Sequence, residues 1–173
     1  MTNSILETPR LVLREMSLDD LDFMAEMLGD PEVMRFWPRP HSREDTACWI
    51  ERQIGRYRDD GYGPWLVLNK ETGAPIGETG LAEQEVDGVK ETEVGYIFHK
   101  PYWGNGYATE AANACLDYAK QLGKTRIIAL IQPVNEPSMR VAQRLGMAHE
   151  KLTDFKGLPH NVMVAKLPRV DRA

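Results

Sequence analysis

Hydrophobic residues alternate with polar ones, or recur at helical spacing, along the N-terminal part of the chain. In PRLVLREM, Leu11 and Leu13 fall on one side of an extended segment, which predicts a strand. Ser17 begins a first expected helix, and a second one spans residues 42–58. The expected apolar stripes are Leu21, Met24, Ala25 and Leu28 in the first helix, and Ala47, Ile50, Ile54 and Tyr57 in the second.

Three strands are predicted next, in WLVLNK, PIGETGLAEQ and KETEVGYIFH, and the turns between them favour an antiparallel meander. A long helix then runs from about residue 107 to a stop at Gly123. Its expected apolar face is Ala108, Ala111, Ala112, Cys115, Ala119 and Leu122. A strand in RIIALIQ, a short helix in NEPSMRVAQRLGM, and strands in HEKLTDF and HNVMVAKL follow. This order predicts an α+β fold in a single domain over residues 1–173, with helices on the faces of one sheet.

Composition narrows the possible function classes. Of the 173 residues, 42% are apolar, and 21 basic against 26 acidic residues leave a net charge of −5. That balance argues against a general nucleic-acid binder, which usually carries a basic face. No run approaches the roughly 20 apolar residues that a membrane helix needs. The N-terminus lacks the pattern of a signal peptide, so we expect a cytoplasmic protein that does not engage a membrane.

Cysteine and histidine do not predict a metal site. The cysteines, Cys48 and Cys115, have neither metal-ligand spacing nor a disulfide framework, and the four histidines show no metal spacing. Cys115 lies on the apolar stripe of its helix, where cysteine usually packs and is inert.

The segment YWGNGYATEA, residues 102–111, places two glycines at the mouth of the long helix. A helix N-terminus carries free N–H groups and partial positive charge, and Gly104 and Gly106 would let an anion approach that backbone. A plain turn before a helix is the alternative interpretation. A nucleotide P-loop would need a lysine after the glycines, and a dinucleotide fingerprint would need Gly or Ala where Thr109 stands. The pyrophosphate loop of acetyltransferases, Gln/Arg-x-x-Gly-x-Gly/Ala, matches except at its first position.

Four segments in the same order resemble the GNAT superfamily of acetyl-CoA-dependent N-acetyltransferases. They are ETPRLVLREM, PIGETGL, TEVGYIFHKPYWGNGYATEA and VNEPSMRVAQRLGM. The form Tyr-Trp-Gly-x-Gly-Tyr-Ala is similar to the branch of ribosomal-protein N-terminal acetyltransferases, the RimJ/RimL-like branch. The resemblance covers nearly the whole chain. It implies a mixed, mostly antiparallel, twisted sheet that is splayed at its middle, with helices on both faces.

The resemblance also implies where acetyl-CoA binds. Its pyrophosphate would lie on the N–H groups of Gly104, Asn105, Gly106, Tyr107, Ala108 and Thr109. Its pantetheine arm would lie in the splay and pair with the backbone of Tyr96, Ile97 and Phe98, which could also supply the oxyanion donor. Gly95 in the same strand is consistent with a bulge there.

Acetyl transfer needs a neutral amine, so a group that accepts the amine proton is sought. Glu93 occupies the family's frequent base position and should face away from Val94 and Tyr96. It could instead be an exposed carboxylate in the KETE cluster. Glu78, one strand away on the acceptor side, is the rival. A base acting through water, or an amine of low pKa that needs no base, are further possibilities.

The departing thiolate can be protonated, and the family often uses a tyrosine that this chain lacks after Gln121. The resemblance implies Ser138 in that role, with Asn135 bonded to the pantetheine arm; both residues could instead cap their helix. Trp37 belongs to a segment that overhangs the acceptor pocket in the family, or is a buried aromatic anchor.

These observations favour an N-acetyltransferase in which an amine attacks acetyl-CoA directly in a ternary complex. The acceptor would be a peptide or protein N-terminus, a polyamine or another amino compound. The alternatives are a detoxifying small-molecule acetyltransferase of the same fold and a non-catalytic acyl-CoA sensor or binding module. A broad amine panel would separate enzyme from sensor. The acceptor's identity, and whether the protein is a monomer or a homodimer, cannot be read from the sequence.

Overall fold

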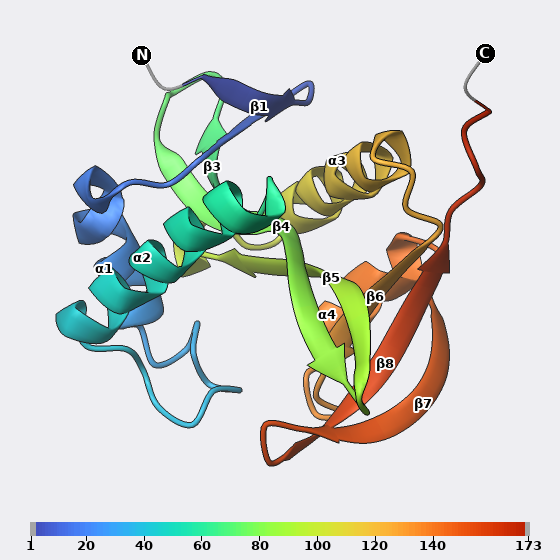
Figure 1. The fold of residues 1–173 in the computed structure, drawn as a ribbon. Coiled ribbons are helices and arrows are strands. Elements are labelled where there is room, and N and C mark those ends of the chain that lie inside the picture. Colours follow the sequence, from blue (N-terminus) through green and yellow to red (C-terminus); the bar gives the residue numbers. More distant parts are fainter. Residues whose placement is uncertain (1–2, 172–173) are drawn as a thin grey trace.

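The computed structural model describes residues 3–171, so the ends of the expected domain 1–173 lie outside the described residues. The described chain forms one eight-stranded sheet in the order β1-β2-β3-β4-β5-β6-β8-β7, with four α-helices (Figure 1). The strands are β1 (Ser4–Glu7), β2 (Leu11–Arg14), β3 (Pro64–Asn69), β4 (Pro75–Val86), β5 (Val89–Phe98), β6 (Arg126–Ile131), β7 (Ala148–Phe155) and β8 (Leu158–Lys166). The α-helices are α1 (Leu21–Leu28), α2 (Arg43–Asp60), α3 (Tyr107–Gln121) and α4 (Glu136–Arg144). The α+β prediction is confirmed.

The predicted antiparallel meander corresponds to β3, β4 and β5, and β2 continues it on the other side of β3. The sequence interpretation missed β1, which pairs antiparallel with β2. This strand has only four residues, SILE, and its side chains are at most half-buried, so its hydrophobic pattern is too short to stand out.

Three predicted apolar stripes were partly wrong. In α2 the buried face consists of Thr46, Ile50, Gln53 and Tyr57, whereas Ile54 is 37% exposed and Ala47 is half-buried. Two polar residues therefore occupy core-facing positions, so hydrophobicity alone misplaced the stripe by one position. In the first helix Ala25 is only half-buried. Leu122 is 41% exposed because α3 ends one residue before it.

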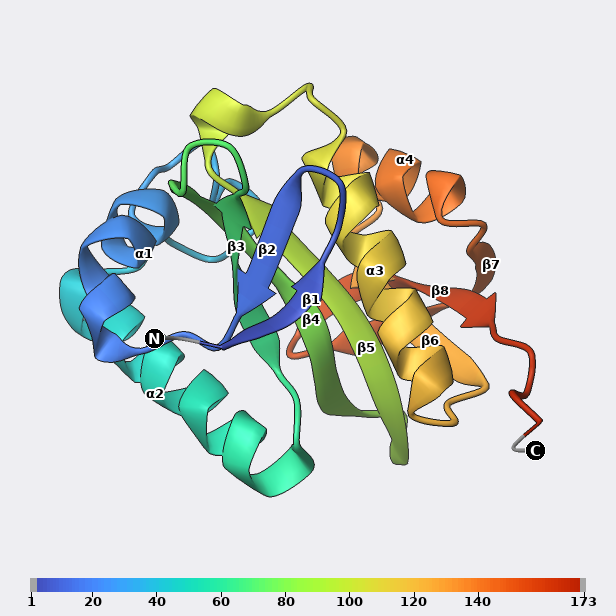
Figure 2. The ribbon, with the colours of Figure 1, turned by 90° about the horizontal axis from the view of Figure 1, so that it is seen from above.

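Helices cover both faces of the sheet (Figures 1 and 2), and a separate hydrophobic cluster lies beneath the helices of each face. On one face, the buried side of α3 packs on strand residues such as Val94 and Phe98, and α4 joins the same cluster through Ala142. On the opposite face, α1 and α2 pack on Leu66, with Ile97 at the edge of that cluster. Alternate residues of β5 therefore point toward different helices.

The sheet is splayed between β5 and β6. These parallel strands share one register pair, Glu93 with Ile128, whereas β6 pairs with β8 along its whole length. Because parallel strands normally form a continuous ladder, the C-terminal part of β5 has an edge not occupied by β6. This edge includes residues 96–98, where the sequence predicted the pantetheine site.

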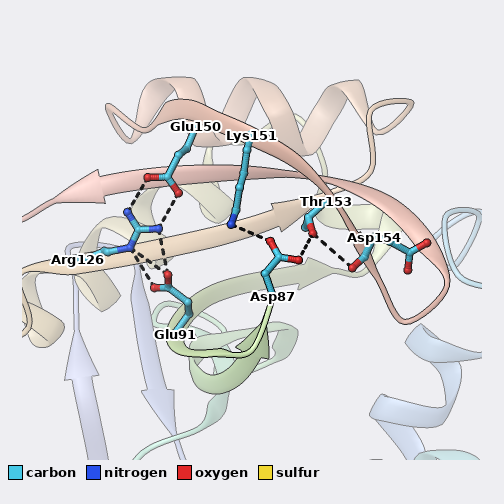
Figure 3. A network of polar contacts seen from close by, with 7 residues as sticks. All are labelled: Asp87, Glu91, Arg126, Glu150, Lys151, Thr153 and Asp154. Carbon is cyan, nitrogen blue, oxygen red and sulfur yellow. Dashed lines mark hydrogen bonds and ion pairs between the residues drawn. The ribbon is translucent and has the colours of Figure 1, made fainter.

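On the other side of this register pair, a polar network joins the strands (Figure 3). Arg126 at the start of β6 lies between Glu91 of β5, at 3.0 Å, and Glu150 of β7, at 2.7 Å. At the turn between β4 and β5, Asp87 pairs with Lys151 at 2.7 Å and accepts a hydrogen bond from Thr153 at 2.6 Å. Strands β5, β6 and β7 are thus tied together on one side of Glu93, and β5 and β6 separate on the other side.

Candidate active site

The glycine segment forms a tight loop between β5 and α3. A short 3₁₀ turn, Lys100–Tyr102, precedes it, and Gly104 and Gly106 have φ angles of 79° and 76°, in the left-handed region that glycine tolerates best. Gly106 is the N-cap of α3, and within the described residues no side chain caps this helix. The first N–H groups of α3 are therefore not engaged by a capping side chain and can bind an anion.

Trp103 stands where the common acetyltransferase loop has Gln or Arg, and its indole makes two contacts. Its indole Nε1 donates a hydrogen bond to the Phe98 carbonyl at 2.7 Å, which ties the loop to the end of β5. The Arg35 guanidinium lies 5.3 Å from the centre of the Trp103 ring, within the range of a cation–π contact. Trp103 therefore fixes the loop against the end of β5 and contacts Arg35.

A cleft of about 760 Å³ joins this loop to the splayed part of the sheet. Most residues predicted from the sequence line it: Trp37, Tyr96, Ile97, Phe98, Gly104, Gly106, Tyr107, Ala108, Thr109, Asn135 and Ser138. Asn105 is not among the lining residues, because its side-chain amide is bonded back to the carbonyls of Tyr102 and Trp103, at 3.1 and 3.2 Å. Glu93 and Glu78 do not line it either; they lie within the sheet.

Sequence reasoning missed several polar residues of this cleft, namely Arg35, Glu110, Asn113, Arg140 and Arg144. Arg140 and Arg144 are four residues apart and share one face of α4, so their spacing was a usable signal. Arg35 and Glu110 offered no such signal, because their importance depends on contacts between distant segments.

At the N-terminus of α4, Asn135 and Ser138 have distinguishable positions. The Asn135 Oδ1 atom accepts a hydrogen bond from the Ser138 N–H at 3.2 Å, so Asn135 caps the helix while lining the cleft. The Ser138 carbonyl accepts a hydrogen bond from the Tyr96 hydroxyl at 2.7 Å, and this bond bridges the gap between β5 and α4. Burial, followed by the nearby Glu93 charge, raises the pKa of Tyr96, which keeps it a neutral phenol.

Glu78 is a carboxylate in the interior of the protein. It is 3% exposed, and it accepts a hydrogen bond from Trp49 Nε1 of α2 at 3.0 Å. Burial raises the pKa of Glu78 to about 7, although the Trp49 hydrogen bond opposes the shift. Glu78 lies opposite Ile97 in the pairing of β4 with β5, next to the strand segment that lines the cleft.

Glu93 lies at the single bridge between β5 and β6. It is half-buried and accepts a hydrogen bond from Gln84 Nε2 at 3.1 Å. Desolvation raises the pKa of Glu93, and the Gln84 hydrogen bond and the charges of Lys156 and Arg56 counteract part of this shift. It alternates with Val94 on the strand, and Val94 packs toward α3.

Trp37 lies where two cavities meet. It lines the main cleft and also a second cavity of about 280 Å³, which Trp49 and His41 share. The Trp49 indole is bonded to Glu78, and its ring centre lies 5.5 Å from that of His41, so one side chain connects the segment before α2 with the buried carboxylate. Cys115 takes no part in the site: burial raises its thiol pKa to about 12, so it stays protonated and unreactive.

The sequence profile of the acetyltransferase (GNAT) domain matches residues 10–148, which is most of the chain. The chain belongs to the GNAT acetyltransferase family. Within the described residues, no helix is long and apolar enough to span a bilayer.

Two relatives from Bacillus subtilis extend this result. The chain is 36% identical over 150 residues to the uncharacterized protein YkkB, covering 84% of this chain and 86% of YkkB. It is 32% identical over 147 residues to the uncharacterized N-acetyltransferase YnaD, covering 84% and 83% of the two chains. Together with the GNAT domain match, these relatives show that the protein is an acetyl-CoA-dependent N-acetyltransferase.

The fold is also that of RimL, a ribosomal L7/L12 α-N-protein acetyltransferase solved in complex with coenzyme A. The TM-score is 0.78 at 17% identity, over 95% of this chain and 98% of RimL. The GNAT fold predicted from the sequence is confirmed.

Proposed function

We propose that this GNAT protein transfers the acetyl group of acetyl-CoA to a primary amine, by direct attack in a ternary complex. One observation carries the proposal: a single cleft connects the uncapped N-terminus of α3 with the β5 edge that β6 does not occupy. The first feature suits a pyrophosphate, and the second offers backbone groups to an extended pantetheine arm. The acceptor is a peptide or protein N-terminus or a small amine.

The glycine loop fits the phosphate group sterically. A Cβ atom built on Gly104 would meet no atom within 4 Å, and one built on Gly106 would approach only Arg10 Nη2, at 3.6 Å. The space beside this backbone is therefore open, as a bound anion requires. We assign the pyrophosphate to the residues from Gly104 to Thr109 and the pantetheine arm to Tyr96–Phe98 and Asn135.

For the chemical step we propose Glu93 as the group that accepts the amine proton, through a bridging water because its carboxylate does not line the cleft. A carboxylate with a raised pKa is a better base near neutral pH than one with an ordinary value. The pKa of Glu78 is also raised, to about 7, so this residue is the rival base. It lies on β4 opposite Ile97, a residue of the β5 segment that lines the cleft. Backbone N–H groups of residues 96–98 would stabilise the negative charge that develops on the thioester oxygen.

Ser138 is proposed to donate a proton to the departing thiolate. Ser138→Ala is expected to lower kcat several-fold, with a smaller change in the KM for acetyl-CoA, because the lost interaction forms mainly in the transition state. Steady-state kinetics per folded molecule measure this change. Ser42→Ala, which removes the serine cap of α2 outside the cleft, is the matched control and should leave kcat unchanged. Normal turnover of Ser138→Ala would leave this residue with a structural role alone.

A screen of amines and peptides with acetyl-CoA tests the proposed function. Release of free CoA thiol that depends on an added amine supports acetyl transfer, and intersecting initial-rate lines support a ternary complex. CoA binding without turnover across polyamines, amino compounds and N-terminal peptides would indicate the non-catalytic sensor instead.

A further inference from the structure

The turn between β1 and β2 lies beside the start of α3 (Figure 2), and one carboxylate joins the two segments. Glu110 accepts hydrogen bonds from the Thr8 hydroxyl at 2.6 Å, from the Arg10 backbone N–H at 3.0 Å and from Arg10 Nε at 2.6 Å. The hairpin that sequence analysis missed is therefore fastened to the helix that begins at the glycine loop.

Glu110 occupies an unexpected position for an acidic residue. Among the cleft-lining residues that the structure describes it is the one carboxylate, and the charged residues that line the cleft with it are Arg35, Arg140 and Arg144. Partial burial acts to raise the pKa of Glu110, but the hydrogen bonds from Thr8 and Arg10 lower it below its usual range. The Glu110 carboxylate is therefore negatively charged, and it lies in the first turn of α3, whose N-terminus is proposed to hold a pyrophosphate. The two negative groups would repel each other.

Arg10 is placed to cancel that charge. Besides its bond to Glu110, its guanidinium lies 4.5 Å from the centre of the Tyr107 ring, the first residue of α3. Its Nη2 atom lies 3.6 Å from the position that a Cβ on Gly106 would take. The guanidinium therefore lies between the carboxylate and the loop, and a planar group with several donors can serve both sides.

We propose that Arg10 is a positioning residue for the acetyl donor: it neutralises Glu110 and holds the first turn of α3 so that the loop accepts a pyrophosphate. The inference rests on the proposed function, since it takes the loop at Gly104–Thr109 as the phosphate site. It assigns to the β1–β2 turn a role in donor binding.

Substitution can distinguish three possible roles of Arg10. If Arg10 acts by cancelling charge, removing the charge of Glu110 makes Arg10 dispensable for binding. If the pair serves only to fasten the hairpin, losing either partner harms the loop to the same extent. A third arrangement, in which Arg10 binds phosphate directly, makes Arg10 necessary whatever stands at position 110.

The experiment measures CoA binding by calorimetry for the wild type, Arg10→Gln, Glu110→Gln and the double variant, at low and high ionic strength. We expect Arg10→Gln to weaken binding about fivefold, Glu110→Gln to bind within about twofold of the wild type, and the double variant to regain most of the loss. The loss in Arg10→Gln should shrink at high ionic strength, because salt screens exposed charges. Arg10→Lys, which keeps the charge, should retain most of the affinity.

Arg58→Gln is the matched control, because Arg58 is an exposed arginine paired with Asp59 outside the cleft; it should bind CoA as the wild type does. Thermal unfolding of every variant identifies any loss of fold. Equal weakening in Glu110→Gln and Arg10→Gln, no rescue in the double variant, or normal binding by Arg10→Gln would each overturn the proposal. A wild-type protein that does not bind CoA would instead contradict the proposed function.

Discussion

Glu93→Gln is expected to lower kcat/KM for the amine acceptor by roughly 10²-fold or more, because the amide keeps the shape of the side chain and removes its basicity. An amine with a pKa well above 7 arrives mostly protonated, so its proton must be accepted before attack. The measurement is the pH dependence of kcat/KM for the wild type and the variant, with the best acceptor found in the amine screen.

The direction in which kcat/KM changes with pH can be predicted. A base is active when deprotonated, and desolvation raises the pKa of Glu93, so wild-type kcat/KM should rise with pH along an acidic limb above the ordinary carboxyl range. In Glu93→Gln that limb should be lost or displaced. A limb near pH 7 in both the wild type and Glu93→Gln would point to Glu78, whose pKa is about 7.

Glu78→Gln is the built-in control and should have a much smaller effect on kcat/KM than Glu93→Gln. If the two substitutions exchange their effects, the base is Glu78 and the assignment of Glu93 is wrong. If neither matters, the acceptor loses its proton to water or is an amine of low pKa.

Gly106→Val should reduce the affinity for acetyl-CoA at least tenfold, which corresponds to about 1.4 kcal/mol. Gly106 has a φ angle of 76°, and the β-branched side chain would extend into the space assigned to the pyrophosphate while straining the backbone at the N-terminus of α3. Calorimetric titration with acetyl-CoA measures the change.

Backbone strain alone must be separated from the loss of the phosphate site. Gly123 ends the same helix with a φ angle of 83°, has no atom within 4 Å of its potential Cβ, and lies outside the cleft. Gly123→Val therefore imposes a comparable strain and should destabilise the fold while acetyl-CoA affinity stays near that of the wild type. Unchanged affinity in a folded Gly106→Val protein would rule out the phosphate assignment.

Sequence alone predicted the features whose determinants are local. The helix boundaries, the meander and the loop at Gly104 and Gly106 follow from short patterns and from the conformational freedom of glycine. The splay was predicted by family resemblance, and the structure confirms it, because β5 and β6 share one register pair, Glu93 with Ile128.

The unpredicted features depend on contacts between distant segments. Glu110 meets Arg10, 100 residues away along the chain, and Gln132 donates a hydrogen bond to the Phe36 carbonyl, 96 residues away, at 2.5 Å. No periodicity encodes such pairs. The buried face of α2 was misplaced for a related reason: Gln53 is a polar residue in a core position that the tertiary packing selects.

The carboxylate of Glu78 has a consequence for the unfolding equilibrium. Its pKa is about 7 in the folded chain and near 4.5 when unfolded, so the unfolded state ionises first as pH rises. The group therefore favours the folded state fully below pH 4.5, and this contribution is lost between about 4.5 and 7, a change of roughly 3 kcal/mol. Denaturant unfolding of Glu78→Gln should show a variant more stable than the wild type above pH 7, with an advantage that shrinks as the solution is acidified. Through this one group, the protein is expected to resist unfolding best in acidic solution and to have lost that contribution once the pH reaches neutrality.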